Sequence, residues 1–257
     1  MGETARRLQT PFDRQLVWPA ETIYPPSLVK LEIKRGTLQT LQGHQWPESL
    51  KELVIENNNL GDLSNVVFPA NLTSIRLSRC GITSVANITW PSSLTKLDLA
   101  LNRLTSLAGQ NLPISLELLR CGGNIASIQD ELVPLVKLRE LSLESNPLTS
   151  VEKLALPSSI KTLNLGQSQC VVFGSLRLPR GLSNLNLGWN TINQLGAIAF
   201  PAELDYFELD SCTILSIEGL ALPRRLEWLE LKDTQCVDMD RLLAHVKENC
   251  PDCVVST

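Results

Sequence analysis

The chain has 257 residues, of which 43% are hydrophobic and 5% aromatic, and its formal net charge is -4. A charge this close to neutral argues against a broad basic surface for nucleic acid or an anionic membrane, so we expect neither partner. No apolar run reaches the roughly 20 residues of a transmembrane helix, and the N-terminal stretch has no apolar signal-peptide core. We therefore expect a soluble, cytoplasmic protein.

Residues 25–237 repeat one pattern. Residues 1–24 follow it poorly and are predicted to form an N-terminal cap, because a first repeat would otherwise expose its strand edge. From there a leucine or isoleucine recurs every 22 residues without an insertion. These positions are Leu28, Leu50, Leu72, Leu94, Leu116, Leu138, Ile160, Leu182, Leu204 and Leu226. A fixed period of this length predicts a repeat solenoid, a stack of coils that cannot fold singly.

Each repeat divides into a strand, a turn and a return leg. The segment holding Leu94, Leu97 and Leu99 alternates apolar and polar residues, which predicts a short strand that pairs in parallel with its copies. An asparagine position follows, whose amides are expected to pair the backbone groups of the turn. It is held by Asn58, Asn102, Asn124, Asn146 and Asn190. The return leg has about a dozen residues and ends at a proline, so we expect extended or 3₁₀ segments there.

The pattern is disturbed in the middle of the array and fades at its end. Cys121 replaces a strand leucine, and Ile125 and Ile128 come one residue early, so we predict a local bend or shift in the sheet near residues 121–135. Beyond Leu231, Asp238 is predicted to cap a helix that reaches about residue 249. Residues 238–257 are therefore predicted to form a C-terminal helical cap over the last coil.

The motif L-x-x-L-x-L-x-x-N-x-L, in phase over roughly residues 25–237, resembles the leucine-rich repeat family. Its leucine–proline opening, as in Leu156-Pro157-Ser158-Ser159-Ile160, is similar to the repeats of bacterial secreted effectors and of oomycete-type leucine-rich repeat proteins. The resemblance implies an α/β-type curved horseshoe with one parallel sheet on its concave face, where a protein partner binds. It does not imply which partner.

The cysteines and histidines predict structure rather than chemistry. Five cysteines take the place of a repeated asparagine or leucine and are expected to be buried. They are Cys80, Cys121, Cys170, Cys212 and Cys236. Cys250 and Cys253 form C-x-x-C, but neither a full zinc ligand set nor a thioredoxin-like context accompanies them. His44 and His245 lie at opposite ends of the array, away from any nucleophile. We predict no catalytic residue, no metal ligand and no cofactor.

The exposed face of the sheet is the remaining candidate site. Its middle is predicted to carry a basic patch of Arg76, Arg79, Lys96, Arg103 and Arg120. Its C-terminal end is predicted to be aromatic and acidic, with Trp189, Tyr206, Glu208, Asp210, Trp228, Glu230 and Asp233. Exposed aromatic residues serve no folding purpose and dominate interface energetics, so this end is a candidate site for a basic, partly apolar protein segment. Alternatively, the C-terminal cap buries Trp228.

We therefore predict a non-enzymatic scaffold for signalling or assembly that binds a protein on the concave face. One alternative is the ligand-binding region of a receptor or protein kinase whose other domains are absent from this chain. A second is a secreted effector that recruits host proteins. A third is an enzyme that uses Cys253. The partner and the oligomeric state are not determined by the sequence.

Overall fold

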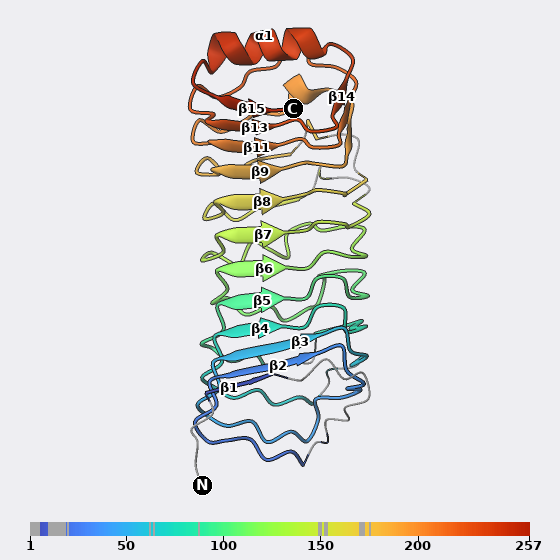
Figure 1. The fold of residues 1–257 in the computed structure, drawn as a ribbon, viewed down its shortest axis with the longest axis vertical. Coiled ribbons are helices and arrows are strands. Elements are labelled where there is room, and N and C mark those ends of the chain that lie inside the picture. The colour runs from blue at the N-terminus through green and yellow to red at the C-terminus, as the bar shows by residue number, and fades with distance from the viewer. Residues whose placement is uncertain are drawn as a thin grey trace. The chain divides into compact units, whose positions relative to one another are not determined.

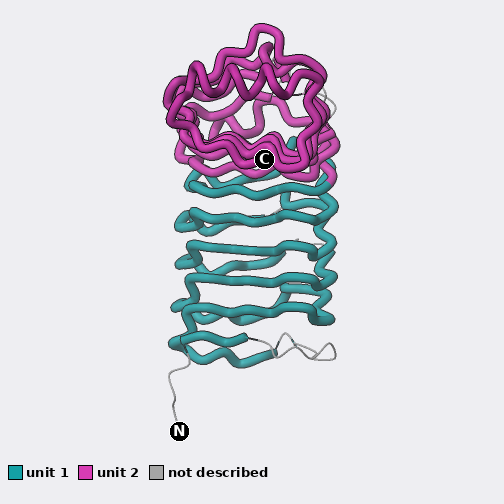
Figure 2. The backbone as a smooth tube through the Cα atoms, turned by 45° about the horizontal axis from the view of Figure 1, so that its top comes forward, with its two compact units in different colours: residues 1–123 teal, residues 124–257 magenta. Residues whose placement is uncertain are grey.

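A computed structural model describes residues 6–9, 19, 21–61, 63, 65–86, 88–148, 151, 154–169, 173–174 and 176–257. The chain divides into two compact units, residues 1–123 and residues 124–257, which Figure 2 shows in different colours. Within each unit the backbone winds into a stack of coils, each with a short strand on one side (Figure 1). The solenoid predicted from the 22-residue period is therefore confirmed in each unit.

The first unit contains parallel strands that are offset by one period. They are β1 (Arg7–Gln9), β2 (Lys30–Lys34), β3 (Glu52–Glu56), β4 (Ser74–Arg76), β5 (Lys96–Asp98) and β6 (Leu118–Arg120). Ser74 pairs with Lys96, and Lys96 pairs with Leu118, so each strand position faces the residue 22 further along the chain. The predicted N-terminal cap, residues 1–24, lies largely outside the described residues.

The second unit carries a parallel sheet on one side of its coils and a smaller one on the return side. The first sheet has β7 (Glu140–Ser142), β8 (Thr162–Asn164), β9 (Asn184–Asn186), β11 (Tyr206–Glu208), β13 (Trp228–Glu230) and β15 (Val254–Ser256). The smaller sheet has β10 (Thr191–Ile192), β12 (Thr213–Ile214) and β14 (Gln235–Cys236), and the 3₁₀ turn η1 spans Leu195–Ala197. Extended and 3₁₀ return legs are as predicted.

The predicted C-terminal helix is confirmed as α1 (Met239–Asn249). Asp238 accepts a hydrogen bond from the backbone N–H of Arg241, and Leu242 and Val246 are buried. A strand that the sequence did not predict follows, because β15 pairs in parallel with β13. The helix is thus the return leg of a further coil. In the described part of the chain, no helix is long and apolar enough to cross a membrane.

The core of each coil consists of the apolar residues that the period predicts. Leu94, Leu97 and Leu99 have no exposed surface, and Leu104 and Leu107 on the return leg are 3% and 1% exposed. Burial of such a side chain contributes about 1.5–3 kcal/mol, whereas ordering each residue costs about 1–2 kcal/mol of backbone entropy. Burial between neighbouring coils is therefore what stabilises the stack.

Buried asparagines join neighbouring coils through hydrogen bonds. Asn102 accepts from the backbone N–H groups of Cys80 and Ile82 at 2.9 and 3.1 Å. Its amide donates to the carbonyl oxygens of Leu77 and Leu99 at 2.6 and 2.8 Å. The side chain thus pairs four backbone groups that the turn leaves outside the sheet.

The asparagine ladder is confirmed at Asn58, Asn146 and Asn190, which are all buried, but the prediction is wrong at Asn124. Asn124 is exposed, and the backbone N–H of Ile125 bonds to the Asn146 side chain instead. The segment between Cys121 and Ile125 is one residue shorter than in the other coils. This deletion turns Asn124 outward, so the irregularity lies in the turn, and the bend or shift predicted for the sheet near residues 121–135 stays a prediction.

The residue before the asparagine position has a left-handed backbone in coil after coil. These positive φ angles lie between 53° and 61° for all but Gly123, at 148°. The residues are Arg35, Asn57, Arg79, Leu101, Gly123, Ser145, Gln167, Trp189, Ser211 and Asp233. The N–H of Leu101 donates to Gly122 and that of Trp189 to Asp210, so each bond reaches the next coil. The sequence gives no sign of this conformation, because the residue types share no chemistry.

Replacing Leu101, which has a φ of 57°, by glycine should stabilise the first unit. A left-handed backbone costs a non-glycine residue about 1–2 kcal/mol, and the greater unfolded-state entropy of glycine offsets part of that gain. We expect a net gain of about 0.5–1 kcal/mol, read as a rise of about 1–4 °C in the thermal midpoint. Leu101→Val should lower the midpoint, because β-branched residues fit this conformation poorly. Equal midpoints for all three proteins would contradict the argument.

Candidate protein-binding face

The outward positions of the strands form what we call the strand face of each unit. In β11 the buried ring of Phe207 lies between Tyr206 and Glu208, and both of these point away from the core. In β13 the buried Leu229 lies in the same way between Trp228 and Glu230. This alternation follows from the period of two in a strand, so the outward residues predicted from the sequence occupy the predicted positions.

On the first unit, acidic residues compensate much of the predicted basic patch. The Arg76 guanidinium lies 3.3 Å from Asp98 and 3.4 Å from Glu56, and Arg120 lies 3.9 Å from Asp98. Arg79, Lys96 and Arg103 form no ion pair with the residues that the structure describes. The five residues therefore do not form a uniformly positive surface.

The same compensation occurs around β1 and β2. Glu32 is 5% exposed and lies 2.8 Å from Arg7 and 3.3 Å from Lys30, which also pairs with Glu52 at 3.0 Å. Burial alone would raise the pKa of the Glu32 carboxyl, but the hydrogen bonds from Arg7 and Lys30 outweigh it and hold the pKa below its ordinary value. Around β1 and β2 the strand face of the first unit is thus a network of paired charges.

On the second unit, the structure brings together the aromatic and acidic residues predicted as a site. We call Trp189, Tyr206, Glu208, Asp210, Trp228 and Glu230 the aromatic–acidic face. Trp189 is 63% exposed and Trp228 is 40% exposed, so the C-terminal segment does not bury Trp228. Tyr206 lies beside Trp228 on the neighbouring strand, and Glu208 lies beside Glu230 in the same register. The Trp228 indole N–H donates a hydrogen bond to the Glu230 carboxylate at 2.5 Å.

Negative charges on this face lie close to one another. Burial raises the pKa of the Glu208 carboxyl, and the charges of Asp210 and Glu230 raise it further, while a hydrogen bond from Asn186 opposes them. Burial and then the charge of Glu208 also raise the pKa of Tyr206. Among the residues described, Glu208, Asp210 and Glu230 form no salt bridge. Unlike Glu32, Glu56 and Asp98 on the first unit, these three carboxylates are not paired with a described cation.

A pocket of about 520 Å³ lies within the aromatic–acidic face. It is lined by Asp205, Tyr206, Glu227, Trp228 and Glu230. Asp205 and Glu227 were not predicted as site residues, and they occupy the position just before β11 and β13, 22 residues apart. Their shared place in the repeat could have predicted that they lie side by side. Together these residues form an open, acidic recess with two aromatic walls.

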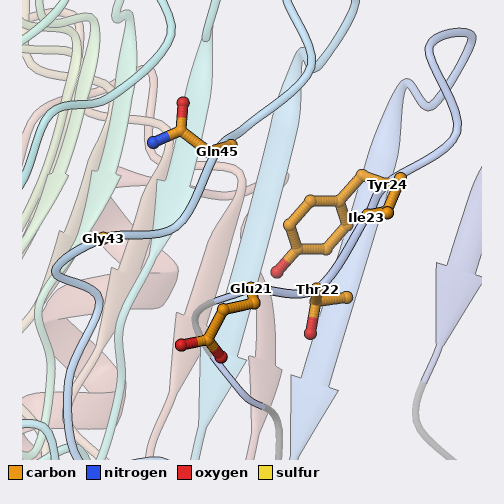
Figure 3. Close-up of a pocket in the computed structure, with 6 residues that line it drawn as sticks. All are labelled: Glu21, Thr22, Ile23, Tyr24, Gly43 and Gln45. Carbon is orange, nitrogen blue, oxygen red and sulfur yellow. The ribbon is translucent and has the colours of Figure 1, made fainter.

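A second pocket of about 520 Å³ lies in the first unit and is shown in Figure 3. Glu21, Thr22 and Ile23 line it from one stretch of chain, and Gly43 and Gln45 line it from the neighbouring stretch. The hydroxyl of Tyr24, also in its lining, hydrogen-bonds to His44 Nδ1 at 3.0 Å, so it is already used within the fold. We find no set of acid, base and nucleophile around this pocket.

The two histidines have local structural contacts. The His44 ring stacks on Trp46 at 4.9 Å between centroids, and burial lowers its pKa. His245 Nδ1 lies 3.4 Å from the side-chain nitrogen of Asn249, within α1. In the described part of the chain, no group of three or more histidine, cysteine or acidic side chains could hold a metal ion.

Buried cysteines substitute for ladder asparagines. The Cys80 thiol lies 3.3 Å from the Ile55 carbonyl, and the Cys212 thiol lies 3.1 Å from that of Leu187. Burial raises the pKa of both thiols to about 11. Cys121 is buried as predicted, Cys236 is half-buried, and Cys170 lies outside the described residues. The raised pKa values of Cys80 and Cys212 keep these two thiols protonated near neutral pH.

The C-x-x-C pair also consists of free thiols. Cys250 is buried with its sulfur 3.3 Å from the Pro223 carbonyl oxygen, and Cys253 is half-buried. Burial and then the neighbouring Cys250 raise the pKa of Cys253 to about 11. Because the thiolate is the reactive form, this environment does not activate Cys253 as a nucleophile.

Comparisons with known proteins agree with this architecture. The model of the leucine-rich repeat family matches residues 91–112, and no curated protein matches the chain significantly. An internalin of Listeria monocytogenes is 16% identical, with a TM-score of 0.57, over 90% of this chain and 81% of its own. YopM of Yersinia enterocolitica is 20% identical, with a TM-score of 0.53, over 91% of this chain and 56% of its own.

A third similar structure comes from an octameric complex of latrophilin 3, Unc5D and the leucine-rich repeats of FLRT2. It is 21% identical, with a TM-score of 0.69, over 92% of this chain and 78% of its own. With identities this low, the three structures establish the fold alone. Together with the family match, the period, the strand register and the asparagine ladder, they show that this chain has the leucine-rich repeat fold.

Proposed function

We propose that this protein is a non-enzymatic interaction scaffold that binds a protein partner through the strand face of its second unit. The observation that carries this proposal is the aromatic–acidic face, where Trp189, Tyr206 and Trp228 lie among carboxylates without a cationic partner in the described residues. Large aromatic side chains provide most of the binding energy in protein interfaces. Their exposure contributes nothing to folding.

The charge of the face defines the partner that fits it. Glu208, Asp210 and Glu230 favour a basic partner segment, whereas an acidic or strongly apolar partner would leave these carboxylates desolvated and unpaired. Leucine-rich repeat folds typically support protein–protein interaction, and one of the similar structures is part of a multiprotein complex. We therefore propose a basic, partly apolar protein segment as the bound partner.

Loss of the two central rings should abolish partner capture. Tyr206→Ala combined with Trp228→Ala removes the aromatic walls of the pocket. Truncation of an aromatic residue at the centre of an interface typically costs about 2 kcal/mol or more of binding free energy. We therefore expect a loss of at least about 100-fold in affinity. The measurement is affinity capture from a lysate with wild-type and variant protein, read by quantitative mass spectrometry. Each candidate partner is then titrated in purified form.

A matched control removes exposed apolar surface elsewhere in the same unit. Leu215 and Val237 are 47% and 76% exposed and lie just after β12 and β14, outside the strand face. Leu215→Ala combined with Val237→Ala should leave capture unchanged. If the Tyr206 and Trp228 variant captures its partners as well as wild type, while both proteins remain folded, the assignment of the site is wrong.

Absence of catalysis is part of this proposal. Cys253, the nucleophile of the enzymatic alternative, has a raised pKa, and its thiol lies 3.7 Å from the Val254 carbonyl oxygen, which speaks against that alternative. A receptor or kinase fragment and a secreted effector would use the same scaffold, and no observation on this chain favours either. The cytoplasmic location, the signalling role and the domain boundaries at residues 24 and 237 stay predictions.

A further inference from the structure

The aromatic–acidic pocket has two adjacent ring walls. Tyr206 and Trp228 are register partners on neighbouring strands, and parallel strands lie about 4.8 Å apart. The Trp228 indole N–H is bound to Glu230, which fixes the edge of the ring and leaves its face apolar. A planar group that enters the pocket can therefore stack against an aromatic surface that is already oriented.

The pocket also has acidic walls whose charges are not neutralised. Asp205, Glu227 and Glu230 line it, and none of them forms a salt bridge with a described residue. A nearby carboxylate behaves differently, since Glu203 pairs with Arg225 at 2.9 Å. In the second unit, Glu203 is thus paired with a cation, whereas the carboxylates that line the pocket are not paired with any described cation.

These two properties together select the chemistry of the occupant. An anion would be repelled, and an apolar side chain would remove water from three carboxylates without replacing its hydrogen bonds. A cation is attracted both by the carboxylates and by the faces of the aromatic rings. Among protein cations, the guanidinium is planar, stacks on aromatic rings and donates paired hydrogen bonds to carboxylates.

We propose that the pocket lined by Tyr206 and Trp228 holds an arginine side chain of the bound partner. This inference rests on the function proposed above and makes it more specific. The arginine stacks on the Trp228 ring and donates to the carboxylates of Asp205, Glu227 and Glu230. The partner segment then continues along the strand face toward Trp189.

A titration with minimal probes tests the occupant. The probes are N-acetyl-arginine methylamide, its lysine counterpart and its citrulline counterpart, which keeps the shape of arginine but lacks the charge. Binding is followed by the indole N–H resonances of the tryptophans in the intact chain. We expect saturable shifts of the Trp228 resonance with arginine, and at least about tenfold weaker binding of citrulline. Equal affinity for citrulline or lysine, shifts confined to Trp189, or no saturable shift would overturn the proposal.

A charge-neutral variant separates this proposal from the proposed function. Glu227→Gln combined with Glu230→Gln keeps the shape of the pocket and should weaken arginine binding at least about tenfold. The control is Glu218→Gln combined with Glu248→Gln, two exposed residues outside the pocket that should change nothing. If partner capture needs the Tyr206 and Trp228 rings but tolerates loss of both charges, the function stands and the arginine proposal fails. If capture tolerates both changes, the assigned binding site fails too.

Discussion

Substitution of Gly196 by alanine should destabilise the second unit more than any change on its surface. A Cβ atom at this position in η1 would overlap the carbonyl oxygen of Glu218 and the backbone nitrogen of Leu220, which belong to the next coil. Backbone cannot rotate away as a side chain can, so the two coils would have to separate. We expect a loss of about 3 kcal/mol or more, and a fall of about 6–12 °C in the thermal midpoint.

Gly181 provides the control for this prediction. A Cβ atom there would lie 2.6 Å from the Nζ atom of Lys161, the flexible end of a long side chain. Gly181→Ala should therefore change the thermal midpoint by no more than about 2 °C. Hydrogen exchange should show increased opening around residues 216–220 in the Gly196 variant only. Similar midpoints for the two variants would show that the close approach of the coils at Gly196 is not required.

Removal of the Asn102 side chain should have the second large effect. Alanine leaves four buried backbone groups without their partners, namely those of Leu77, Cys80, Ile82 and Leu99. Each unsatisfied buried group costs about 1–3 kcal/mol before relaxation. Allowing for partial relaxation and water entry, we expect Asn102→Ala to lower the free energy of unfolding of the first unit by about 3–4 kcal/mol. Denaturant titration measures this change.

Asn124 offers an internal comparison because it has the same residue type at the same place in the period. It is exposed, so Asn124→Ala should cost no more than about 0.5 kcal/mol. The loss of stability in Asn102→Cys should lie between the losses in these two variants. The Cys80 and Cys212 thiols show that a cysteine at this position keeps one hydrogen bond to the previous coil. A cost at Asn124 comparable to that at Asn102 would contradict the outward orientation of the Asn124 side chain.

The sequence predicted the repeated part of the fold because the 22-residue period determines which residues face the core. Leu94, Leu97 and Leu99 are buried as expected, and the strands begin at the positions that alternation indicates. Predictions failed where residues are deleted from or added to a segment of a coil. A single deletion after Cys121 turned Asn124 outward. The return leg that contains α1 is longer than the others, so β15 does not fall at the position that the period predicts. Counting residues cannot show how a coil absorbs such a change.

The site was predictable in position but not in charge balance. Tyr206 and Trp228 could be placed on one face because they share a position in the period. Whether Arg76 is free or paired with Asp98 depends on side-chain conformation, which the period does not specify. The basic patch therefore proved to be partly neutralised, while the acidic end is not paired by described residues. That Asp205 and Glu227 line the pocket is known only from the structure.

The left-handed residue before each asparagine position has a consequence for how such a chain can change in length. Its N–H reaches 21 residues forward, as from Leu101 to Gly122 and from Gln167 to Gly188. An insertion or deletion between the donor and its acceptor breaks these bonds unless a return leg accommodates it, as the longer return leg that contains α1 does, whereas a duplicated or excised segment of 22 residues restores the same partners. Whole repeats are therefore the natural unit of inheritance for this architecture, and a gene for it can grow or shrink by one coil without redesign of the others.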